Sequence, residues 1–182
     1  MLIITVSGPA GSGKTTYAKK LAQHLNLQYL SAGEIFRRIA KKMGKTLAEL
    51  SGQCECSHEI DRKIDEQIKA KAARGNVVAD GRLTGFMLKD MADLKIYVIA
   101  SPQTRIARIM KRDGVSESYA KEETFSRDRS EKKRFQEIYH INIDDLSIYD
   151  IILNTEKWSE EAMIQILLNA VNSRKQLTNE HW

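Results

Sequence analysis

The stretch LIITVSGPAGSGKTTYAKKLAQHL near the N-terminus constrains the fold more than any other part of this 182-residue chain. Its apolar run, Leu2–Val6, is short and rich in β-branched residues, which is typical of a buried strand. Gly8, Gly11 and Gly13 follow at once, and glycines let a loop adopt positive φ angles and bring bare backbone close to a ligand. We therefore predict a strand, a ligand-binding loop and a helix that begins at Lys14.

The loop matches the phosphate-binding pattern G-x-x-x-x-G-K-[ST] at Gly8, Gly13, Lys14 and Thr15, in a strand–loop–helix setting. Backbone N–H groups of such a loop lie at the positive end of a helix dipole and form an anion site. We expect Lys14 to reach the β- and γ-phosphates of a nucleoside triphosphate and the Thr15 hydroxyl to bind Mg²⁺. The alternative is an ordinary glycine-rich turn before a helix. The expected phosphate-binding residues are Ser7, Gly8, Pro9, Ala10, Gly11, Ser12, Gly13, Lys14, Thr15 and Thr16.

Length and composition indicate one α/β domain with a full core. The formal net charge of +5 and the pI of about 9.1 suit anionic small molecules. Lys and Arg are interleaved with Glu and Asp, so the composition does not call for a nucleic-acid partner. No apolar run approaches the roughly 20 residues of a membrane span, and the first strand leads into the loop without a signal peptide. We expect a cytoplasmic monomer that binds neither membranes nor nucleic acid.

Four further apolar runs predict strands, and helical patterns lie between them. The alternation predicts a parallel sheet of about five strands, joined by right-handed crossovers and covered by helices on both faces. Ser159 is expected to cap a last helix that ends near Arg174, and residues 175–182, with Trp182, are interpreted as a polar tail. The further strand candidates are Leu27–Leu30, Asn76–Ala79, Lys95–Ala100 and Tyr149–Leu153.

Residues 45–74 have a helical and heavily charged pattern, with an expected break near Ser51–Gly52. Ser57 is expected to cap the helix that follows. Because the segment has few apolar positions for its length, we expect a mobile helical insertion and not a layer of the core. Cys54 and Cys56 are separated by one residue, a spacing that fits neither a C-x-x-C redox pair nor a zinc knuckle, and we interpret them as incidental thiols.

The apolar run Asn76–Ala79 is followed directly by the polar residues Asp80, Gly81 and Arg82. Phosphate-loop enzymes use an acid that follows such a strand to hold Mg²⁺, and ligands of open α/β sheets bind at the carboxyl ends of the strands. We therefore expect Asp80 and Thr15 to form a metal site. A solvated Asp-Gly turn is the alternative interpretation.

Two later stretches place arginines at helical spacing. Arginines recur in steps of three and four from Arg105 to Arg112, which makes one cationic stripe. Arg127, Glu131 and Arg134 share one face of the next predicted helix. Charged faces are usually solvated surface, and the composition alone leaves that interpretation open.

Together with the phosphate loop and these helices, four segments resemble the nucleoside monophosphate kinases, above all the short, archaeal-type cytidylate kinases. The segments are SAGEIFR, the EID of Glu59–Asp61, VVADGR and DDLSIYDIILNTEKWS. The resemblance covers the chain from Leu2 to about Ala170. It implies one phosphate-loop kinase domain over residues 1–182. The implied parts are a core at about 1–30, 75–112 and 145–175, a monophosphate-binding insertion at about 31–74 and a lid at about 112–140.

The resemblance also implies roles for individual residues. Arg37 and Arg82 are expected to bind the acceptor phosphate, whereas Arg38 is expected to be a solvated charge. Arg112 is expected to bind the donor phosphates, and the later arginines to reach both substrates. The implied acceptor-binding residues are Ser31, Gly33, Arg37, Asp80, Gly81, Arg82 and Glu131, and the implied catalytic residues are Lys14, Arg82, Arg127 and Arg134.

One position departs from the pattern of the bacterial cytidylate kinases. Those proteins continue the Gly-Arg pair with an aspartate that helps to recognise cytosine, and this chain has Leu83 there. The longer insertion of the bacterial form is also absent. A preference for cytosine is therefore implied by the whole-chain resemblance and not by a base-reading residue.

The resemblance implies transfer of the γ-phosphoryl group of ATP, with Mg²⁺, to CMP or dCMP, which gives ADP and CDP or dCDP. A sibling kinase that uses UMP, AMP or a small metabolite such as shikimate stays open as an alternative. A GTPase switch would carry an N-K-x-D motif, but the nearest string, NTEKW at Asn154, lacks the aspartate. An RNA-binding protein would need a basic groove with exposed aromatic residues.

Overall fold

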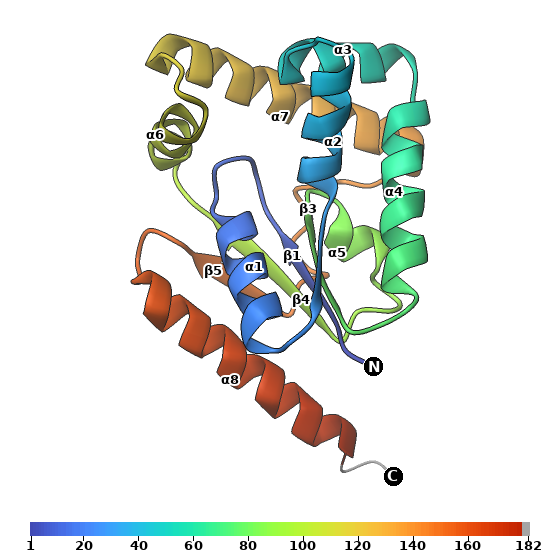
Figure 1. Ribbon diagram of the computed structural model, residues 1–182, viewed down its shortest axis with the longest axis vertical. Coiled ribbons are helices and arrows are strands. Elements are labelled where there is room, and N and C mark those ends of the chain that lie inside the picture. Colours follow the sequence, from blue (N-terminus) through green and yellow to red (C-terminus); the bar gives the residue numbers. More distant parts are fainter. Residues whose placement is uncertain (180–182) are drawn as a thin grey trace.

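The centre of the structure is one five-stranded parallel sheet (Figure 1). Its strands are β1 (Ile3–Ser7), β2 (Gln28–Ser31), β3 (Val77–Gly81), β4 (Leu94–Ile99) and β5 (Ile151–Asn154). They lie in the order β2-β3-β1-β4-β5, and every neighbouring pair is parallel. The computed structural model describes residues 1–179, so Trp182 lies outside the described residues. The predicted fold class is confirmed.

The two strands at the centre are buried on both faces, which explains their continuous apolar runs. Every residue of β1 and of β3 is buried. In the register of the sheet, Ser7 of β1 pairs with Gly81 of β3, and Ser31 of β2 pairs with Asp80. The carboxyl ends of three strands therefore meet at one edge, and the glycine loop and Asp80 lie there together.

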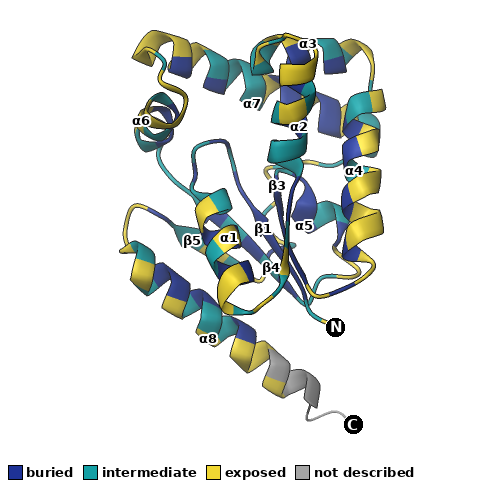
Figure 2. Cartoon of the chain, in the orientation of Figure 1, coloured by how far each residue is buried: buried dark blue, intermediate teal, exposed yellow. Residues whose placement is uncertain are grey.

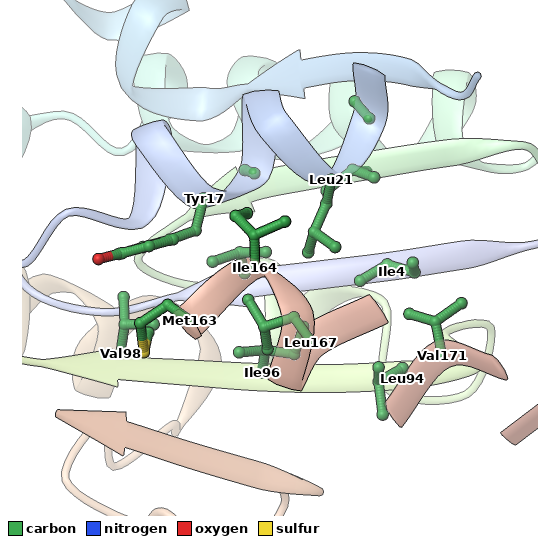
Figure 3. Packing of buried hydrophobic residues seen from close by; sticks show 14 residues of the cluster. Ile4, Tyr17, Leu21, Leu94, Ile96, Val98, Met163, Ile164, Leu167 and Val171 are labelled. Carbon is green, nitrogen blue, oxygen red and sulfur yellow. The ribbon is translucent and has the colours of Figure 1, made fainter. Parts of the chain in front are cut away.

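Two helices cover one face of the sheet. They are α1 (Lys14–His24) and α8 (Glu160–Asn179). Their apolar side chains, among them Leu21 and Leu167, pack over Ile4 and Ile96 of the strands (Figure 3). Helix α8 continues past its expected end near Arg174, because neither glycine nor proline interrupts the chain there.

The opposite face carries the segment that was expected to stand outside the core. Its helices are α2 (Ala32–Lys42), α3 (Leu47–Cys56) and α4 (Glu59–Ala72), followed after β3 by the short α5 (Thr84–Met87). Leu50 and Ile68 are 0% and 1% exposed, and both join the apolar cluster that contains Val77 of β3. Figure 2 shows α4 with buried and exposed residues on different sides. The expectation that this segment is not a layer of the core is wrong, because the few apolar residues recur on one face of each helix, which is enough to build a layer. Its mobility stays a prediction.

The helix boundaries in this segment also differ from those expected. Helix α3 continues through Ser51–Gly52, and the break falls at Ser57, which is the C-cap of α3 and does not cap α4. A capping box lies at Thr46 instead, whose hydroxyl accepts from the N–H of Glu49 at 3.1 Å while the Glu49 carboxylate accepts from the Thr46 N–H at 2.8 Å. At the start of α2 the expected cap is confirmed, because Ser31 accepts from the N–H of Glu34.

Two more helices lie beyond the carboxyl ends of the strands. They are α6 (Pro102–Asp113) and α7 (Glu117–Tyr139). Helix α7 extends from α6 to α3 across this end of the molecule (Figure 1). Ile106 and Ile109 of α6 pack with Ala120 of α7 and with Ala10 of the glycine loop. None of the helices in residues 1–179 combines the length and the apolar composition that a membrane span needs.

Replacing Ile68 tests whether α4 is part of the core. We expect Ile68→Ala to lower the free energy of unfolding by about 2–5 kcal/mol, because it leaves a cavity beneath a fully buried helix face. Urea denaturation measures the loss. The matched control is Gln67→Ala on the exposed side of the same helix, with a change within about 0.5 kcal/mol. Equal, small changes in both variants would contradict the assignment of α4 to the core.

Candidate functional site: a phosphate-loop cleft

A cleft of about 540 Å³ opens at the carboxyl ends of the strands, between the glycine loop and helices α2, α4, α6 and α7. Most of the predicted site residues line it. Ser7 and Ser12 are fully buried and do not line the cleft. The predicted residues that line the cleft are Ala10, Gly11, Gly13, Lys14, Thr15, Thr16, Gly33, Arg37, Asp80, Gly81, Arg82, Arg112, Arg127, Glu131 and Arg134, and those that do not are Ser7, Gly8, Pro9, Ser12 and Ser31.

Two of these serines, Ser7 and Ser31, have structural partners. Ser7 Oγ accepts from the N–H of Gly85 at 3.1 Å and lies 3.2 Å from Thr84 Oγ1, so it joins β1 to α5. Ser31 Oγ is occupied by the cap of α2. These side chains hold the elements that carry the cleft and do not face into it.

The glycine loop adopts the conformation that its composition predicts. Gly8, Gly11 and Gly13 all have positive φ angles. A Cβ atom at Gly11 would lie 2.6 Å from the carbonyl oxygen of Arg105, so α6 packs against the loop where only glycine fits. The loop backbone is thereby fixed in place next to the start of α1.

Lys14 lies in the cleft, and its Nζ donates to the Pro9 carbonyl at 3.3 Å. Burial lowers the pKa of Lys14 to about 8, and the nearby Arg82 adds to this effect while Asp80 and Glu131 oppose it. An anion placed beside Lys14 would stabilise the charged amine. The site is therefore one where binding of a phosphate group is coupled to uptake of a proton.

Thr15 and Asp80 place two side-chain oxygens together in the cleft beside Lys14. The Thr15 hydroxyl donates to Asp80 Oδ2 at 2.6 Å, and Tyr29 donates to Asp80 Oδ1 at 3.3 Å. Within residues 1–179 no group of three His, Cys, Asp or Glu side chains could hold a metal ion. One hydroxyl and one carboxylate fit Mg²⁺, which takes few protein ligands and completes its shell with phosphates and water. The residues present are thus suited to a metal that arrives with a nucleotide.

Arginines in the cleft are paired with carboxylates of α7. Arg82 pairs with Asp128 and with Glu131, whose Oε2 lies 2.5 Å from Arg82 Nε. Arg127 pairs with the other oxygen of Glu131 at 3.3 Å and with Glu123 at 3.9 Å. Glu131 therefore links two arginines that the sequence predicts at the site, and it raises the pKa of Arg82 against the opposing effect of burial.

Asp128 is a site residue that sequence reasoning missed. It binds Arg82 and also Arg105, at 2.7 Å, while Arg105 donates from Nε to the Ala10 carbonyl at 2.7 Å. Asp128 thus connects α7 to the glycine loop. In the sequence it is one of many acids in a charged helix, and no local signal marks it.

The other two arginines of α6 have different partners. Arg108 donates to the Gly11 carbonyl at 3.4 Å and to Thr155 Oγ1 at 2.8 Å, while the Thr155 hydroxyl donates to the Ser12 carbonyl. Arg112 lines the cleft and pairs with Asp113, its neighbour in the chain. Thr155 was also missed, because a threonine after a strand carries no distinctive signal.

Arg37 is half-buried on the α2 wall of the cleft and makes no hydrogen bond or ion pair with a described residue. Arg38 is exposed, as expected for a solvated charge. A guanidinium with its donors unused in a cleft is suited to bind phosphate in a bidentate manner.

Arg134 is 1% exposed and lies at the end of the cleft near α3 and α4. Its Nε donates to Asp61 Oδ2 at 2.8 Å, and Nη1 donates to the Ser51 carbonyl at 3.2 Å and to Ser130 Oγ at 2.5 Å. This side chain joins α7 to α3 and α4. Its predicted catalytic role stays a prediction, because its donors are occupied by protein groups.

The Asp61–Arg134 pair provides a test of stability. We expect Asp61→Asn to lower the free energy of unfolding by about 3–5 kcal/mol, because it leaves the buried guanidinium without a counter-charge. Urea denaturation measures the change. Glu59→Gln, two residues earlier at an exposed position of α4, is the matched control and should change stability by less than about 0.5 kcal/mol. A loss no larger than that of the control would show that the pair is not needed for folding.

The sheet, the glycine loop and the cleft at the carboxyl ends of the strands define a P-loop NTPase fold. Solved structures with this arrangement include an uncharacterized protein from Eubacterium ventriosum (TM-score 0.71, 23% identity, 95% of this chain and 99% of that chain). They also include shikimate kinase from Bacteroides thetaiotaomicron (TM-score 0.62, 18% identity, 94% and 98%). At these identities the similarity concerns the fold.

Sequence comparison identifies the family. Residues 3–157 match the model of the cytidylate kinase-like family. The cytidylate kinase of Staphylothermus marinus is 47% identical over 92% of this chain and 94% of its own length, and that of Pyrococcus horikoshii is 46% identical over 94% and 88%. The cytidylate kinase of Archaeoglobus fulgidus is 44% identical over 94% and 96%. The chain belongs to the cytidylate kinase-like family, so the predicted family is confirmed.

Proposed function

We propose that this protein is a nucleoside monophosphate kinase that transfers the γ-phosphoryl group of ATP to CMP or dCMP. The products are ADP and CDP or dCDP. The observation that carries the proposal is family membership together with a cleft that combines a phosphate loop with at least three arginines, Arg37, Arg82 and Arg127. Shikimate kinases share the fold at 17–18% identity, which gives no support to shikimate as the acceptor.

Phosphoryl transfer depends on holding two anions in line and neutralising their charge. In our proposal the triphosphate lies on the glycine loop, with Lys14 on its terminal phosphates. The acceptor phosphate binds Arg37, whose donors are unused by described residues, and Arg82. When Mg²⁺ is bound, held by Thr15 and Asp80, it neutralises part of the phosphate charge.

In the free protein, the arginines of the cleft already have carboxylate partners, which a phosphate has to replace. Arg82 and Arg127 are already charge-balanced by Glu131 and Asp128. An arriving phosphate therefore replaces Glu131 or Asp128 as the partner of an arginine. Because both carboxylates belong to α7, this helix moves when they are displaced. We propose that residues 112–140 act as the lid and residues 31–74 hold the acceptor. Closure of the lid excludes water, which would otherwise accept the phosphoryl group.

We also propose that the enzyme works as a cytoplasmic monomer without nucleic acid. One chain supplies both the phosphate loop and the arginines of the cleft, which supports a monomer. Basic residues alternate with acidic residues along the charged helices, and this supports the absence of a nucleic-acid partner.

Turnover on a panel of acceptors tests the function. With ATP and Mg²⁺ in a coupled assay for ADP, we expect CMP and dCMP to be consumed with a higher kcat/KM than UMP, AMP or shikimate. In the same assay Lys14→Ala should lower kcat by at least about 10²–10³-fold, because the transferred phosphate loses its cation. Lys19→Ala, at an exposed position of α1, is the matched control and should keep full activity.

Two results would contradict the proposal. One is the absence of turnover with every monophosphate while ATP is bound, and the other is substantial transfer by a folded Lys14→Ala protein. Circular dichroism and the urea midpoint show whether each variant is folded.

The lowered pKa of Lys14 predicts proton uptake on ATP binding. Free Lys14 has a pKa of about 8, and bound phosphates raise that value, so the complex holds more protons than the free protein at pH values between the two. We expect uptake of about half a proton at pH 8 and almost none at pH 6.5. Calorimetry in buffers of different ionisation enthalpy measures it. Lys14→Arg keeps its charge throughout and should show no uptake; an unchanged uptake would assign the proton to another group.

A further inference from the structure

The end of the cleft formed by α4 and the C-terminal half of α7 differs in chemistry from the phosphate loop. Figure 1 shows α4 on the opposite side of this end of the molecule from α6, which packs against the loop. Its lining combines apolar and charged side chains, and an apolar wall with a few placed polar groups is typical of sites for organic ligands. The apolar lining residues are Phe36, Ile64, Leu83 and Phe135, and the charged ones are Asp61, Asp65, Glu131 and Arg134.

Asp61 and Arg134 pair with each other, whereas Glu131 pairs with Arg82 and Arg127. Asp61 Oδ2 accepts from Arg134 Nε at 2.8 Å, and Asp61 Oδ1 accepts from Nη2 at 3.4 Å. The remaining nitrogen of Arg134 is bound to the Ser51 carbonyl and to Ser130. Both oxygens of Asp61 and all three nitrogens of Arg134 are thus engaged in the buried pair and its neighbours.

Asp65 is different, because only one of its oxygens is in use. Tyr139, at the last position of α7, donates its hydroxyl proton to Asp65 Oδ2 at 2.5 Å. Asp65 Oδ1 has no hydrogen-bond partner among residues 1–179, and the side chain lines the cleft. The Tyr139 bond fixes the carboxylate and leaves Oδ1 as an oriented acceptor.

We infer that Asp65 determines which pyrimidine the enzyme accepts, by receiving a hydrogen bond on Oδ1 from the exocyclic amino group of the acceptor base. This inference rests on the proposed function. Cytosine carries an amino group at C4, whereas uracil carries a carbonyl oxygen there. A carbonyl facing Oδ1 would place two acceptors against each other and leave both unpaired, which costs far more than a lost contact.

The ionisation of Asp65 fits this role. Burial raises the pKa of Asp65 to about 6, the Tyr139 hydrogen bond and Lys69 oppose the rise, and Asp61 adds to it. The group is therefore ionised at pH 7.5 and accepts hydrogen bonds on both oxygens. A neutral carboxylic acid would be able to donate a hydrogen bond to the uracil carbonyl, which would reduce the discrimination between cytosine and uracil.

The test compares kcat/KM for CMP and for UMP at pH 7.5 in the wild type and in Asp65→Asn. Asparagine keeps the shape and offers an NH₂ group that donates to the uracil carbonyl. We expect the CMP-to-UMP ratio of kcat/KM to fall by about 10- to 100-fold, with a loss for CMP and a gain for UMP. Glu66→Gln, the next residue on α4 and exposed, is the matched control and should leave the ratio unchanged.

Tyr139→Phe supplies a second test that keeps the packing of the ring. It frees Asp65 Oδ2 and releases the carboxylate, so we expect the CMP-to-UMP ratio to fall several-fold, mainly through a higher KM for CMP. A purely structural role of Tyr139 would lower stability without moving the ratio.

The outcomes separate the two proposals. A folded Asp65→Asn protein with an unchanged CMP-to-UMP ratio would overturn the role of Asp65 while leaving the proposed CMP kinase activity intact. A wild type with a higher kcat/KM for UMP than for CMP would also overturn the role of Asp65. A wild type that phosphorylates no monophosphate would overturn the proposed function and this inference with it.

Discussion

Ion pairs between arginines and carboxylates hold the cleft together before any substrate arrives. Arg82 and Arg134 are nearly buried, and an uncompensated guanidinium in such a place would destabilise the fold by several kcal/mol. Asp128 and Asp61 supply the counter-charges. Because α7 provides one member of each pair, the docking of this helix on the glycine loop at one end and on α3 and α4 at the other depends on these contacts.

The same ion pairs define which parts of the site are able to change partners. A phosphate presents the charge and the oxygen geometry that a guanidinium already receives from a carboxylate, so the exchange at Arg82 avoids exposing a bare buried charge. Arg134 has no such freedom, since it also holds the Ser51 carbonyl of α3. The phosphate end of the cleft is thus suited to rearrangement on binding, whereas the α4 end is suited to a fixed shape.

The phosphate loop was predictable because its chemistry is local. Lys14 and Thr15 follow the glycines directly, and Asp80 ends an apolar run, so pattern and function coincide in short stretches. Asp128 escaped prediction because its partner Arg105 lies 23 residues away, and acids in charged helices share one local pattern. Asp61 belongs to the stretch Glu59–Asp61 that carries part of the family resemblance, but its pairing with Arg134, 73 residues away, was not predicted. The break expected at Ser51–Gly52 was wrong for a related reason, since tertiary packing of α3 outweighed the low helix propensity of glycine.

Base recognition lies outside what the phosphate-binding motifs determine. Leu83, which follows the Gly-Arg pair, is 4% exposed and offers the cleft an apolar wall without a hydrogen-bonding group. In our proposal, discrimination by hydrogen bonds falls to Asp65 of α4, because Asp61 and Arg134 are already paired with each other. Asp65 stands on a helix apart from the glycine loop and Arg82, so our inference places base recognition away from the phosphate-binding residues. On this inference, substrate choice and phosphoryl transfer depend on different residues of the cleft.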